Sequence, residues 1–271
     1  MQIAVIATGF FAIIATLLPL LRSDAWWIRM FDFPRAQIAV IGAASLAGYF
    51  YLQPDWGTAG PWFMGALVVC LVRLAYVMFP YTPLARQQVE QSRGSGVRWS
   101  LVCANVLMTN RDSQQLVRII SAADPDVILL VEADDWWQQQ MRQFETSHRY
   151  IVHQPQDNTY GMLLYSRVEL IDPNVHFLVQ NDIPSIHAIV KLTPELEVEL
   201  YCLHPRPPFP TEDDESTHRD AELLLVGKKI KGRNKPTVVC GDLNDVAWSR
   251  TNDLFQDISG LLDPRLGRGF F

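Results

Sequence analysis

The sequence has little charge and few cysteines, and its first third lacks lysine altogether. Charged residues make up 19% of the 271 residues and hydrophobic residues 49%, whereas a typical soluble protein has roughly 25% charged residues. This shortage of charge indicates a membrane-embedded part. The cysteines form no Cys-x-x-Cys pair and lie in apolar runs, which excludes a small disulfide-stapled scaffold and favours buried free thiols. They are Cys70, Cys103, Cys202 and Cys240.

Positive charge is scarce, and it is divided unevenly along the chain. The net charge is −6, and residues 1–79 hold four arginines against three aspartates, so this segment carries +1 and residues 80–271 carry −7. A strongly basic, non-specific nucleic-acid-binding protein is therefore excluded. One basic cluster remains, and it either steers an anionic substrate or is a solvated helix end. It consists of Lys228, Lys229, Lys231, Arg233 and Lys235.

Three long apolar runs fill the region without lysine. Residues 3–21, 36–52 and 59–79 each approach the roughly 17–25 residues that a helix needs to cross the hydrocarbon core. The first run lacks a basic leader and is longer than the ~7–15 apolar residues of a signal peptide. We therefore predict three transmembrane helices. Residues 80–96, polar with proline and glycine near the two ends, are predicted to be a linker.

The arginines predict how these helices are oriented. They lie in the first loop and just after the third run, whereas residues 53–58 of the second loop hold no lysine or arginine. By the positive-inside rule, the first loop and the C-terminal region face the cytoplasm. The arginines concerned are Arg22, Arg29, Arg35, Arg86, Arg93 and Arg98.

One arginine lies inside an apolar run. Arg73 belongs to the third predicted span. It either contacts a lipid headgroup or a partner, or it snorkels or faces the other two helices. With no other ionisable residue in the spans, a transporter or proton relay is not expected, and the region is interpreted as an anchor.

From residue 97 the pattern alternates between apolar strands and amphipathic helices. Mixed helices and many strands predict an α+β domain over residues 97–271, with two packed sheets flanked by helices. Helices are predicted at 112–123, 134–147 and 215–231. Strands are predicted at 97–104, 127–131, 150–153, 161–166, 175–178, 186–192, 197–204 and 235–240.

Polar residues follow the strongest apolar strands at their C-terminal ends. Side chains at strand ends can converge on one rim of a sheet sandwich, and carboxylates with amides form an oxygen-rich setting that suits Mg²⁺. Taken alone, each residue also fits an ordinary turn or a helix cap. The residues are Asn105, Glu132, His204, Asp242 and Asn244.

Taken in order, these blocks resemble the endonuclease/exonuclease/phosphatase superfamily, whose fold is that of pancreatic deoxyribonuclease. The resemblance implies a four-layer α/β/β/α sandwich over residues 97–271. An anchor ahead of such a domain is similar to a bacterial subgroup, which implies the bacterial inner membrane with the domain on its cytoplasmic side. The matching blocks are Ala104-Asn105-Val106, Asp124 through Glu132, Gly161 through Arg167, Leu203-His204, and Gly241-Asp242-Leu243-Asn244-Asp245.

The resemblance further implies metal-assisted hydrolysis of a phosphoester. Glu132 and Asn105 would hold Mg²⁺, with Mn²⁺ as a substitute. Asp242 would orient and deprotonate the attacking water, and Asn244 would fix the water or the phosphate. His204 would stabilise the transition state at phosphorus.

Two further residues are candidates for substrate contact. Arg206 follows His204 on the same extended segment and is either a phosphate contact or a solvated loop arginine. Tyr160 directly precedes a matched block and could reach the site. The expected partners are the lipid bilayer and a phosphoester substrate, which is a nucleic acid, a phospholipid or a small phosphoester.

The sequence departs from the family pattern at its C-terminus. Family members finish with a Ser-Asp-His block, which is not found after Asn244. We therefore expect the sandwich to be incomplete at its C-terminus. This departure leaves a second function open, in which the chain is a non-catalytic, membrane-anchored binding or scaffold protein.

Overall fold

The structure is a computed structural model that describes residues 1–21, 23–53, 57–91, 94, 96–207 and 217–269. Several sequence-based expectations fall outside these described residues. They concern Arg22, residues 54–56 of the second loop, residues 92, 93 and 95 of the predicted linker, residues 215–216 at the start of a predicted helix, and residues 270–271 at the end of the predicted domain.

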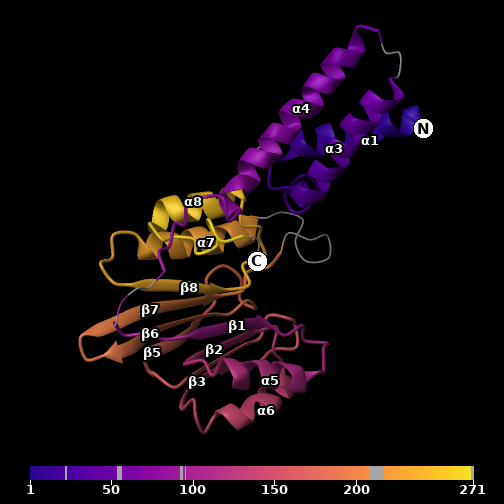
Figure 1. The fold of residues 1–271 in the computed structure, drawn as a ribbon. Helices are drawn as coiled ribbons and strands as arrows, with labels where there is room; N and C mark the ends of the chain where they lie inside the picture. Colours follow the sequence, from indigo (N-terminus) through magenta and orange to yellow (C-terminus); the bar gives the residue numbers. More distant parts are fainter. Residues whose placement is uncertain (22, 54–56, 92–93, 95, 208–216, 270–271) are drawn as a thin grey trace.

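The chain begins with three long helices, and two 3-10 segments and one short helix lie between the first two. They share a small apolar core, and Ser45 Oγ donates a hydrogen bond to the Val5 carbonyl oxygen of the neighbouring helix at 2.6 Å. Figure 1 shows the three helices as one bundle. The elements are α1 Gln2–Leu17, η1 Leu18–Leu20, α2 Trp26–Arg29, η2 Met30–Asp32, α3 Arg35–Leu52, α4 Ala59–Met78 and η3 Phe79–Tyr81.

Two segments among the described residues are long and apolar enough to cross a membrane. They are Gln2–Leu20 and Ala59–Tyr81, and only 22% of the most apolar window of each is buried inside the protein. The core helix of a soluble protein would be mostly buried. The large apolar side chains that these helices expose, such as Phe11, Ile14 and Val69, therefore favour a lipid environment.

The second predicted span does form a helix, α3, but it is not one of these two segments, because Arg35 and Gln37 lower its hydropathy. Its insertion in a membrane stays a prediction. Arg73 of α4 is half-buried and lines a small hollow with Thr16 and Phe31. This position agrees with the interpretation in which Arg73 faces the other two helices.

Two four-stranded sheets make up the rest of the molecule. The first has the order β1-β2-β4-β3, with β1 and β2 parallel, and the second has the order β5-β6-β7-β8, with β7 and β8 parallel. All other pairings are antiparallel. The strands are β1 Leu101–Asn105, β2 Val127–Val131, β3 Tyr150–Gln154, β4 Met162–Ser166, β5 Glu169–His176, β6 Ser185–Thr193, β7 Leu196–Leu203 and β8 Thr237–Gly241.

Three apolar cores separate four layers, so the predicted α/β/β/α sandwich is confirmed (Figure 1). The middle core lies between the sheets, where Leu129 of β2 and Leu200 of β7 belong to one cluster. Helices α5 and α6 cover the first sheet around Trp137, and α7 and α8 cover the second sheet around Leu223. The helices are α5 Ser113–Ala123, α6 Asp135–Met141 with η4 Arg142–Phe144, α7 Thr217–Ile230 and α8 Arg250–Ser259.

Four elements differ from the sequence-based prediction. Strand β1 begins at Leu101 rather than at 97. Strand β5 begins at Glu169 rather than 175, because a bulge after Ile171 lets the chain pass Asp172 and Pro173 and continue as a strand. Helix α6 ends at Met141 and closes in a 3-10 turn. Helix α8 was not predicted, and it begins where the Ser249 hydroxyl accepts a hydrogen bond from the Asn252 backbone nitrogen at 3.0 Å.

The expectation of buried thiols is only partly right. All four cysteines are free, and Cys70 and Cys202 are buried. Cys103, however, is exposed, because it lies on the edge strand β1. The Cys202 and Cys240 sulfurs lie 3.8 Å apart on the paired strands β7 and β8.

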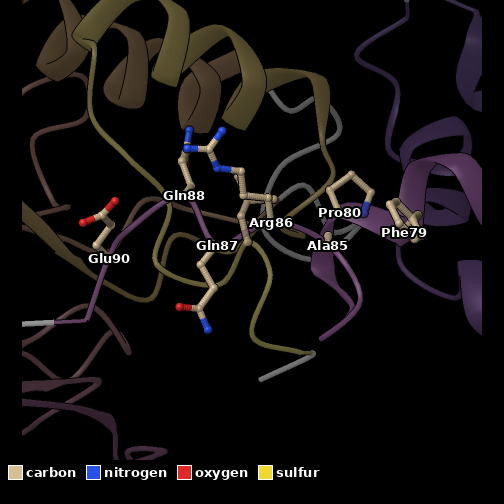
Figure 2. Close-up of a pocket in the computed structure, with 8 residues that line it drawn as sticks. Phe79, Pro80, Ala85, Arg86, Gln87, Gln88 and Glu90 are labelled. Atoms are coloured by element: carbon tan, nitrogen blue, oxygen red, sulfur yellow. The ribbon is translucent and has the colours of Figure 1, made fainter.

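The predicted linker, where it is described, packs along the last residues of the domain. The Gly267 backbone nitrogen donates to the Pro80 carbonyl at 2.8 Å, and Arg268 donates to the Val89 carbonyl at 2.7 Å. A hollow of about 460 Å³ lies beside this contact (Figure 2). Its lining consists of Phe79, Pro80, Ala85, Arg86, Gln87, Gln88, Glu90 and Leu266.

Candidate active site

The candidate residues lie where two parallel strand pairs, one from each sheet, reach their C-terminal ends. Asn105 ends β1, and Glu132 directly follows β2, its parallel neighbour. His204 directly follows β7, and Asp242 directly follows β8, again a parallel pair. Because the C-terminal ends of parallel strands meet at one edge, each sheet presents two of these side chains together.

Asn105 joins the two sheets. Its side-chain nitrogen Nδ2 donates to Glu132 Oε1 at 2.6 Å and to Asp242 Oδ2 at 3.0 Å. Its oxygen Oδ1 accepts a hydrogen bond from the backbone nitrogen of Leu107 at 2.9 Å, which fixes how the amide is turned. Two carboxylates that are 110 positions apart in the sequence therefore face a single amide.

His204 lies beside the same carboxylate. Its Nε2 is 3.9 Å from Glu132 Oε1, and the residue is only 2% exposed. The ring of Tyr160, from the segment before β4, lies against it with a centroid separation of 5.3 Å. The imidazole is thus held in place next to the carboxylate pair, as a transition-state donor would need to be.

Arg206 extends this arrangement outward. Its guanidinium carbon lies 5.3 Å from the centroid of the Tyr160 ring, and its Nη2 donates to Asp182 Oδ2 at 2.7 Å. The stacking on Tyr160 keeps the guanidinium near the site. The ion pair with Asp182 means that a substrate phosphate would compete with a carboxylate for it.

Asn244 connects the two loops that carry His204 and Asp242. Its Nδ2 donates to the Pro205 carbonyl at 2.9 Å, and its backbone nitrogen donates to Asp242 Oδ1 at 3.0 Å. Its amide nitrogen is therefore engaged with backbone, which favours a role in holding the loops together. All seven candidate residues lie in this one region: Asn105, Glu132, Tyr160, His204, Arg206, Asp242 and Asn244.

The backbone around the site is strained. Leu107, Glu132 and Asn244 all have left-handed backbone conformations, with φ of 53°, 58° and 50°. A non-glycine residue in this region costs of order 1–3 kcal/mol, and such residues cluster at functional sites. Glu132 and Asn244 are themselves candidate residues, and Leu107 lies two residues after Asn105, so left-handed turns direct the chain out of β1, β2 and β8 near these side chains.

Two glycines allow the close approaches behind the site. A Cβ at Gly161 would lie 1.9 Å from the Ala133 carbonyl oxygen, and one at Gly241 would lie 1.8 Å from the Leu203 carbonyl oxygen. Both contacts are far shorter than real Cβ contacts, so a side chain at either position would displace the backbone. The absence of a side chain at Gly161 therefore allows the start of β4 to pack against the turn after Glu132. At Gly241 it allows the end of β8, just before Asp242, to pack against β7.

The donor chemistry fits a hard divalent cation. Glu132 Oε1 and Asp242 Oδ2 face the same point, and carboxylate oxygens are ligands that Mg²⁺ prefers. Asn105 presents its Nδ2 to this point and its Oδ1 to the Leu107 backbone nitrogen, so its amide would have to turn to offer an oxygen to a metal ion. In the part of the chain that the structure describes, no group of three His, Cys, Asp or Glu side chains is arranged to hold a metal. A two-carboxylate set is compatible with Mg²⁺, which keeps several waters and takes further ligands from substrate phosphates.

The basic cluster lies away from this site. Arg233 Nη1 is 2.9 Å from Glu199 Oε1, and Lys235 Nζ is 3.1 Å from Glu197 Oε2, so two of its five charges are paired within the second sheet. Lys228, the first lysine of the cluster, lies in the last turn of α7. The N-terminal end of this helix is the one near the site, because Arg219 contacts Asn244. The solvated-helix-end interpretation fits this placement better.

The sequence analysis missed Arg219, which supports the site from behind. This α7 residue is 2% exposed, and its Nη1 donates to the carbonyl oxygen of Asn244 at 3.0 Å. The signal was present: Arg219 stands four residues before Leu223, at the next position of the apolar stripe of the helix. A charged residue on a buried stripe indicates a specific buried partner.

A comparison with protein-family models identifies the C-terminal region. The model described as the Endonuclease/Exonuclease/phosphatase family matches residues 102–271. A comparison with curated proteins finds no match. The matched range includes all seven candidate residues.

Solved structures similar to the chain include three from different organisms. TDP2 from D. rerio, complexed with single-strand DNA product, is 17% identical, with 61% of this chain and 66% of that chain covered and a TM-score of 0.48. Sphingomyelinase C from Streptomyces griseocarneus is 12% identical (59% and 69% covered, TM-score 0.46). An endonuclease/exonuclease/phosphatase from Beutenbergia cavernae is 18% identical (58% and 52% covered, TM-score 0.45). The chain thus spans between about half and about two thirds of these relatives.

Proposed function

The chain belongs to the Endonuclease/Exonuclease/phosphatase family, and from this premise we propose that it is a membrane-anchored, Mg²⁺-dependent phosphoester hydrolase. Enzymes of this family are hydrolases that use divalent metal ions. The observation that carries the proposal for this chain is that Glu132 and Asp242, from two different sheets, meet at the Asn105 side chain, with His204 beside Glu132. The alternative, a non-catalytic binding or scaffold protein, would not require these groups to be arranged around one point.

The proposed chemistry assigns each side chain a separate task. Glu132, and Asn105 once its amide oxygen is turned toward the site, would hold the metal ion, which supplies Lewis-acid neutralisation of phosphate charge when bound. Asp242 accepts a proton from a water as the oxygen of that water forms a bond to phosphorus and the bond to the leaving alkoxide breaks. His204 donates a hydrogen bond to a phosphoryl oxygen as negative charge develops there.

The remaining candidates position the substrate and the loops. Arg206, stacked on Tyr160, would contact a phosphate oxygen by exchanging its ion pair with Asp182 for the substrate. Asn244 would hold the Asp242 loop against the His204 segment. All the proposed substrate contacts are thus made to one phosphate group. Nucleic acids, phospholipids and small phosphoesters, the three proposed substrate classes, all contain such a group.

The bilayer is the other proposed partner. Two apolar helices with mostly exposed surfaces support an anchor. The arginine distribution supports a cytoplasmic position of the hydrolase domain. The similarity of an anchored domain of this family to a bacterial subgroup supports the bacterial inner membrane as the location. An anchor of this kind would confine hydrolysis to substrates that come within reach of the membrane surface.

Hydrolysis of chromogenic substrates tests the proposal. We expect the full chain in detergent micelles to hydrolyse bis(p-nitrophenyl) phosphate or p-nitrophenyl phosphate with Mg²⁺ or Mn²⁺, and EDTA to abolish the reaction. The variants Glu132→Gln and Asp242→Asn should each lower turnover at least ~100-fold, because each removes a carboxylate that the chemistry uses.

The matched control is Glu195→Gln, which removes an exposed carboxylate in the turn between β6 and β7. Its turnover should equal that of the wild type. Full activity in either site variant would show that the site is assigned to the wrong residues. A folded wild type without metal-dependent turnover on either substrate would favour the binding or scaffold function.

A further inference from the structure

Arg219 connects the candidate site to a charge network beneath it. Its side chain is 1% exposed, with Nη1 3.0 Å from the Asn244 carbonyl oxygen and 3.4 Å from Asp245 Oδ1. Its Nε and Nη2 both donate to Asp220 Oδ1, at 3.0 and 2.8 Å. A buried guanidinium is stable only when its donors are satisfied in this way. The conformation of the Asp242–Ser249 loop is thus tied to Arg219.

The loop itself has little freedom apart from this tie. Asp245 is buried, which raises the pKa of its carboxyl, whereas the nearby charge of Arg219 lowers that pKa. The Ser249 hydroxyl contacts Asp245 Oδ2 at 2.5 Å, and Asn252 Nδ2 donates to the Val246 carbonyl at 2.7 Å. A shift of Arg219 would therefore be transmitted to Asn244 and, two residues earlier, to Asp242.

The network continues into the N-terminal helices. Arg29 of α2 is 8% exposed, and its Nη2 lies 3.8 Å from Asp220 Oδ2 and 3.3 Å from Thr251 Oγ1. Arg29 Nη1 in turn lies 3.5 Å from Asp32 Oδ2. Charges of alternating sign thus run from the N-terminal segment to the site in the order Asp32, Arg29, Asp220, Arg219, Asp245.

Two neutral contacts secure the same junction. Trp248 Nε1 donates to the Asp32 carbonyl oxygen at 2.8 Å, and the Tyr81 hydroxyl donates to the Ala247 carbonyl oxygen at 2.7 Å. The rings of Tyr81 and Trp248 pack edge to face, with centroids 5.9 Å apart. Both hydrogen bonds connect the N-terminal region to the loop that follows Asp242. In Figure 1 the helical bundle meets the hydrolase domain at the α7 and α8 layer.

We infer that residues 24–35, between the first two apolar helices, are a positioning element of the hydrolytic site. Arg29 is its central residue, and it acts on Asp242 and Asn244 through Asp220 and Arg219. This inference rests on the proposed hydrolase function. It gives the N-terminal region a second role beyond anchoring: the segment that faces the domain completes the support of the catalytic loop. Arg29 is a positioning residue, because it contacts no candidate substrate-binding or catalytic side chain.

The expected effect of losing Arg29 is on turnover rather than on substrate binding. Small displacements of a catalytic group cost rate because the reacting atoms lose their alignment. The substrate contacts Arg206 and Tyr160 belong to other segments and should be unaffected. We expect Arg29→Met to lower kcat about 10-fold with little change in KM, and Arg29→Lys to restore part of the loss.

The test combines hydrogen exchange with kinetics on the full chain in detergent micelles. In Arg29→Met, amides of residues 242–250 should exchange at least about fivefold faster, while those of β2 should be unchanged. Trp248→Phe, which removes the donor to Asp32 but keeps an aromatic ring, should loosen the same loop. The matched control is Arg86→Met, which removes an exposed arginine of the predicted linker and should change neither exchange nor kcat.

The two readouts separate the inference from the proposed function. Unchanged loop exchange and unchanged kcat in both Arg29→Met and Trp248→Phe would overturn the inference while leaving the hydrolase intact. If loop exchange is faster in Arg29→Met but the wild type hydrolyses neither nitrophenyl substrate, the proposed hydrolase function is overturned. Only a structural coupling between Arg29 and the loop then remains. A double variant Arg29→Met with Arg219→Lys should lose less activity than the product of the single losses, because both act on one loop. A double variant whose loss of activity equals the product of the two single losses would show that Arg29 and Arg219 do not act through the same loop.

Discussion

At the scale of single residues, the site is built from side chains whose backbone is in an unfavourable conformation. Glu132 leaves β2 with φ of 58°, and only this turn lets its carboxylate face Asn105 rather than continue along the strand. Asn244 makes a similar turn after β8, which an asparagine tolerates better than a glutamate does. The strain at Glu132 is offset by the hydrogen bond that it accepts from Asn105 Nδ2 at 2.6 Å.

A second residue with an unusual environment lies outside the site. Glu222 of α7 is buried, and burial raises the pKa of its carboxyl to about 7. A folded-state pKa above the unfolded value of about 4.5 means that the folded state holds the proton more tightly. The resulting stabilisation is complete below pH ~4.5 and is lost as the pH rises through ~7.

We therefore expect Glu222→Gln to gain stability relative to the wild type as the pH rises. Glutamine mimics the protonated acid and has no proton to lose, so the difference in the free energy of unfolding should grow by about 2–3 kcal/mol between pH 5 and 9. Denaturant unfolding at several pH values measures this. The exposed Glu195→Gln should show a flat difference, and a flat difference for Glu222→Gln would show that this carboxyl titrates normally.

At this scale the sequence predicted the candidate side chains better than their supports. Asn105, Glu132, His204 and Asp242 stand out because a polar residue directly follows or ends an apolar strand. Arg219 could have been noticed because it continues the apolar stripe of α7, but its partners Asp220, Asp245 and Arg29 carry no such signal. Only the three-dimensional packing shows which groups these charges contact.

At the scale of elements, the site depends on how closely the parallel strands β7 and β8 approach at their ends. Leu203 and Gly241 are paired in the register, and Gly241 has φ of 138°. This conformation and the 1.8 Å that would separate a Cβ from the Leu203 carbonyl oxygen both require glycine. His204 and Asp242, the next residues on each strand, are adjacent for this reason.

Substitution at this position should therefore damage both fold and function. We expect Gly241→Ala to destabilise the domain by about 2–4 kcal/mol and to lower turnover, since the ends of β7 and β8 must separate. Denaturant unfolding and nitrophenyl phosphate hydrolysis measure the two effects. Gly96→Ala is the control, because a Cβ there meets nothing within 4 Å. Wild-type stability in Gly241→Ala would contradict the close approach.

The sequence predicted most elements of the domain but not all of their limits. Strands such as β2 and β4 are continuous apolar runs and were located correctly. Helix α8 was missed because Leu254, Phe255 and Ile258 are its only large apolar residues, and the Ser249 cap is not distinctive by itself. The length of β5 depends on a bulge at Asp172, which a period-two pattern does not reveal.

At the scale of the whole molecule, the N-terminal helices and the C-terminal domain form one contact network. The segment between α1 and α3 touches the domain through Arg29 and Asp32, and the end of α4 touches it through Tyr81. The first loop and the domain are therefore on the same side of any membrane that the long helices cross. The arginine-based prediction of orientation requires the same arrangement.

Membrane extraction and reporter fusion test this arrangement. The chain should stay in the membrane pellet after alkaline carbonate treatment and be released by detergent, because the exposed apolar helices need lipid or detergent. A reporter joined after Phe271 should be active on the cytoplasmic side. Release by carbonate would show that the helices do not anchor the chain in the membrane. A reporter that is active only outside the cytoplasm would show that the predicted orientation is wrong.

Binding of Mn²⁺ to the full chain, followed by electron paramagnetic resonance with Mg²⁺ as competitor, tests the proposed metal site at the strand ends. We expect one Mn²⁺ site, from which Mg²⁺ displaces the bound ion. Glu132→Gln should weaken its affinity by about 10–100-fold, while the exposed control Glu195→Gln leaves it unchanged. Equal Mn²⁺ affinity in the wild type and Glu132→Gln, or no binding in a folded wild type, would contradict a metal-dependent hydrolytic site at the strand ends.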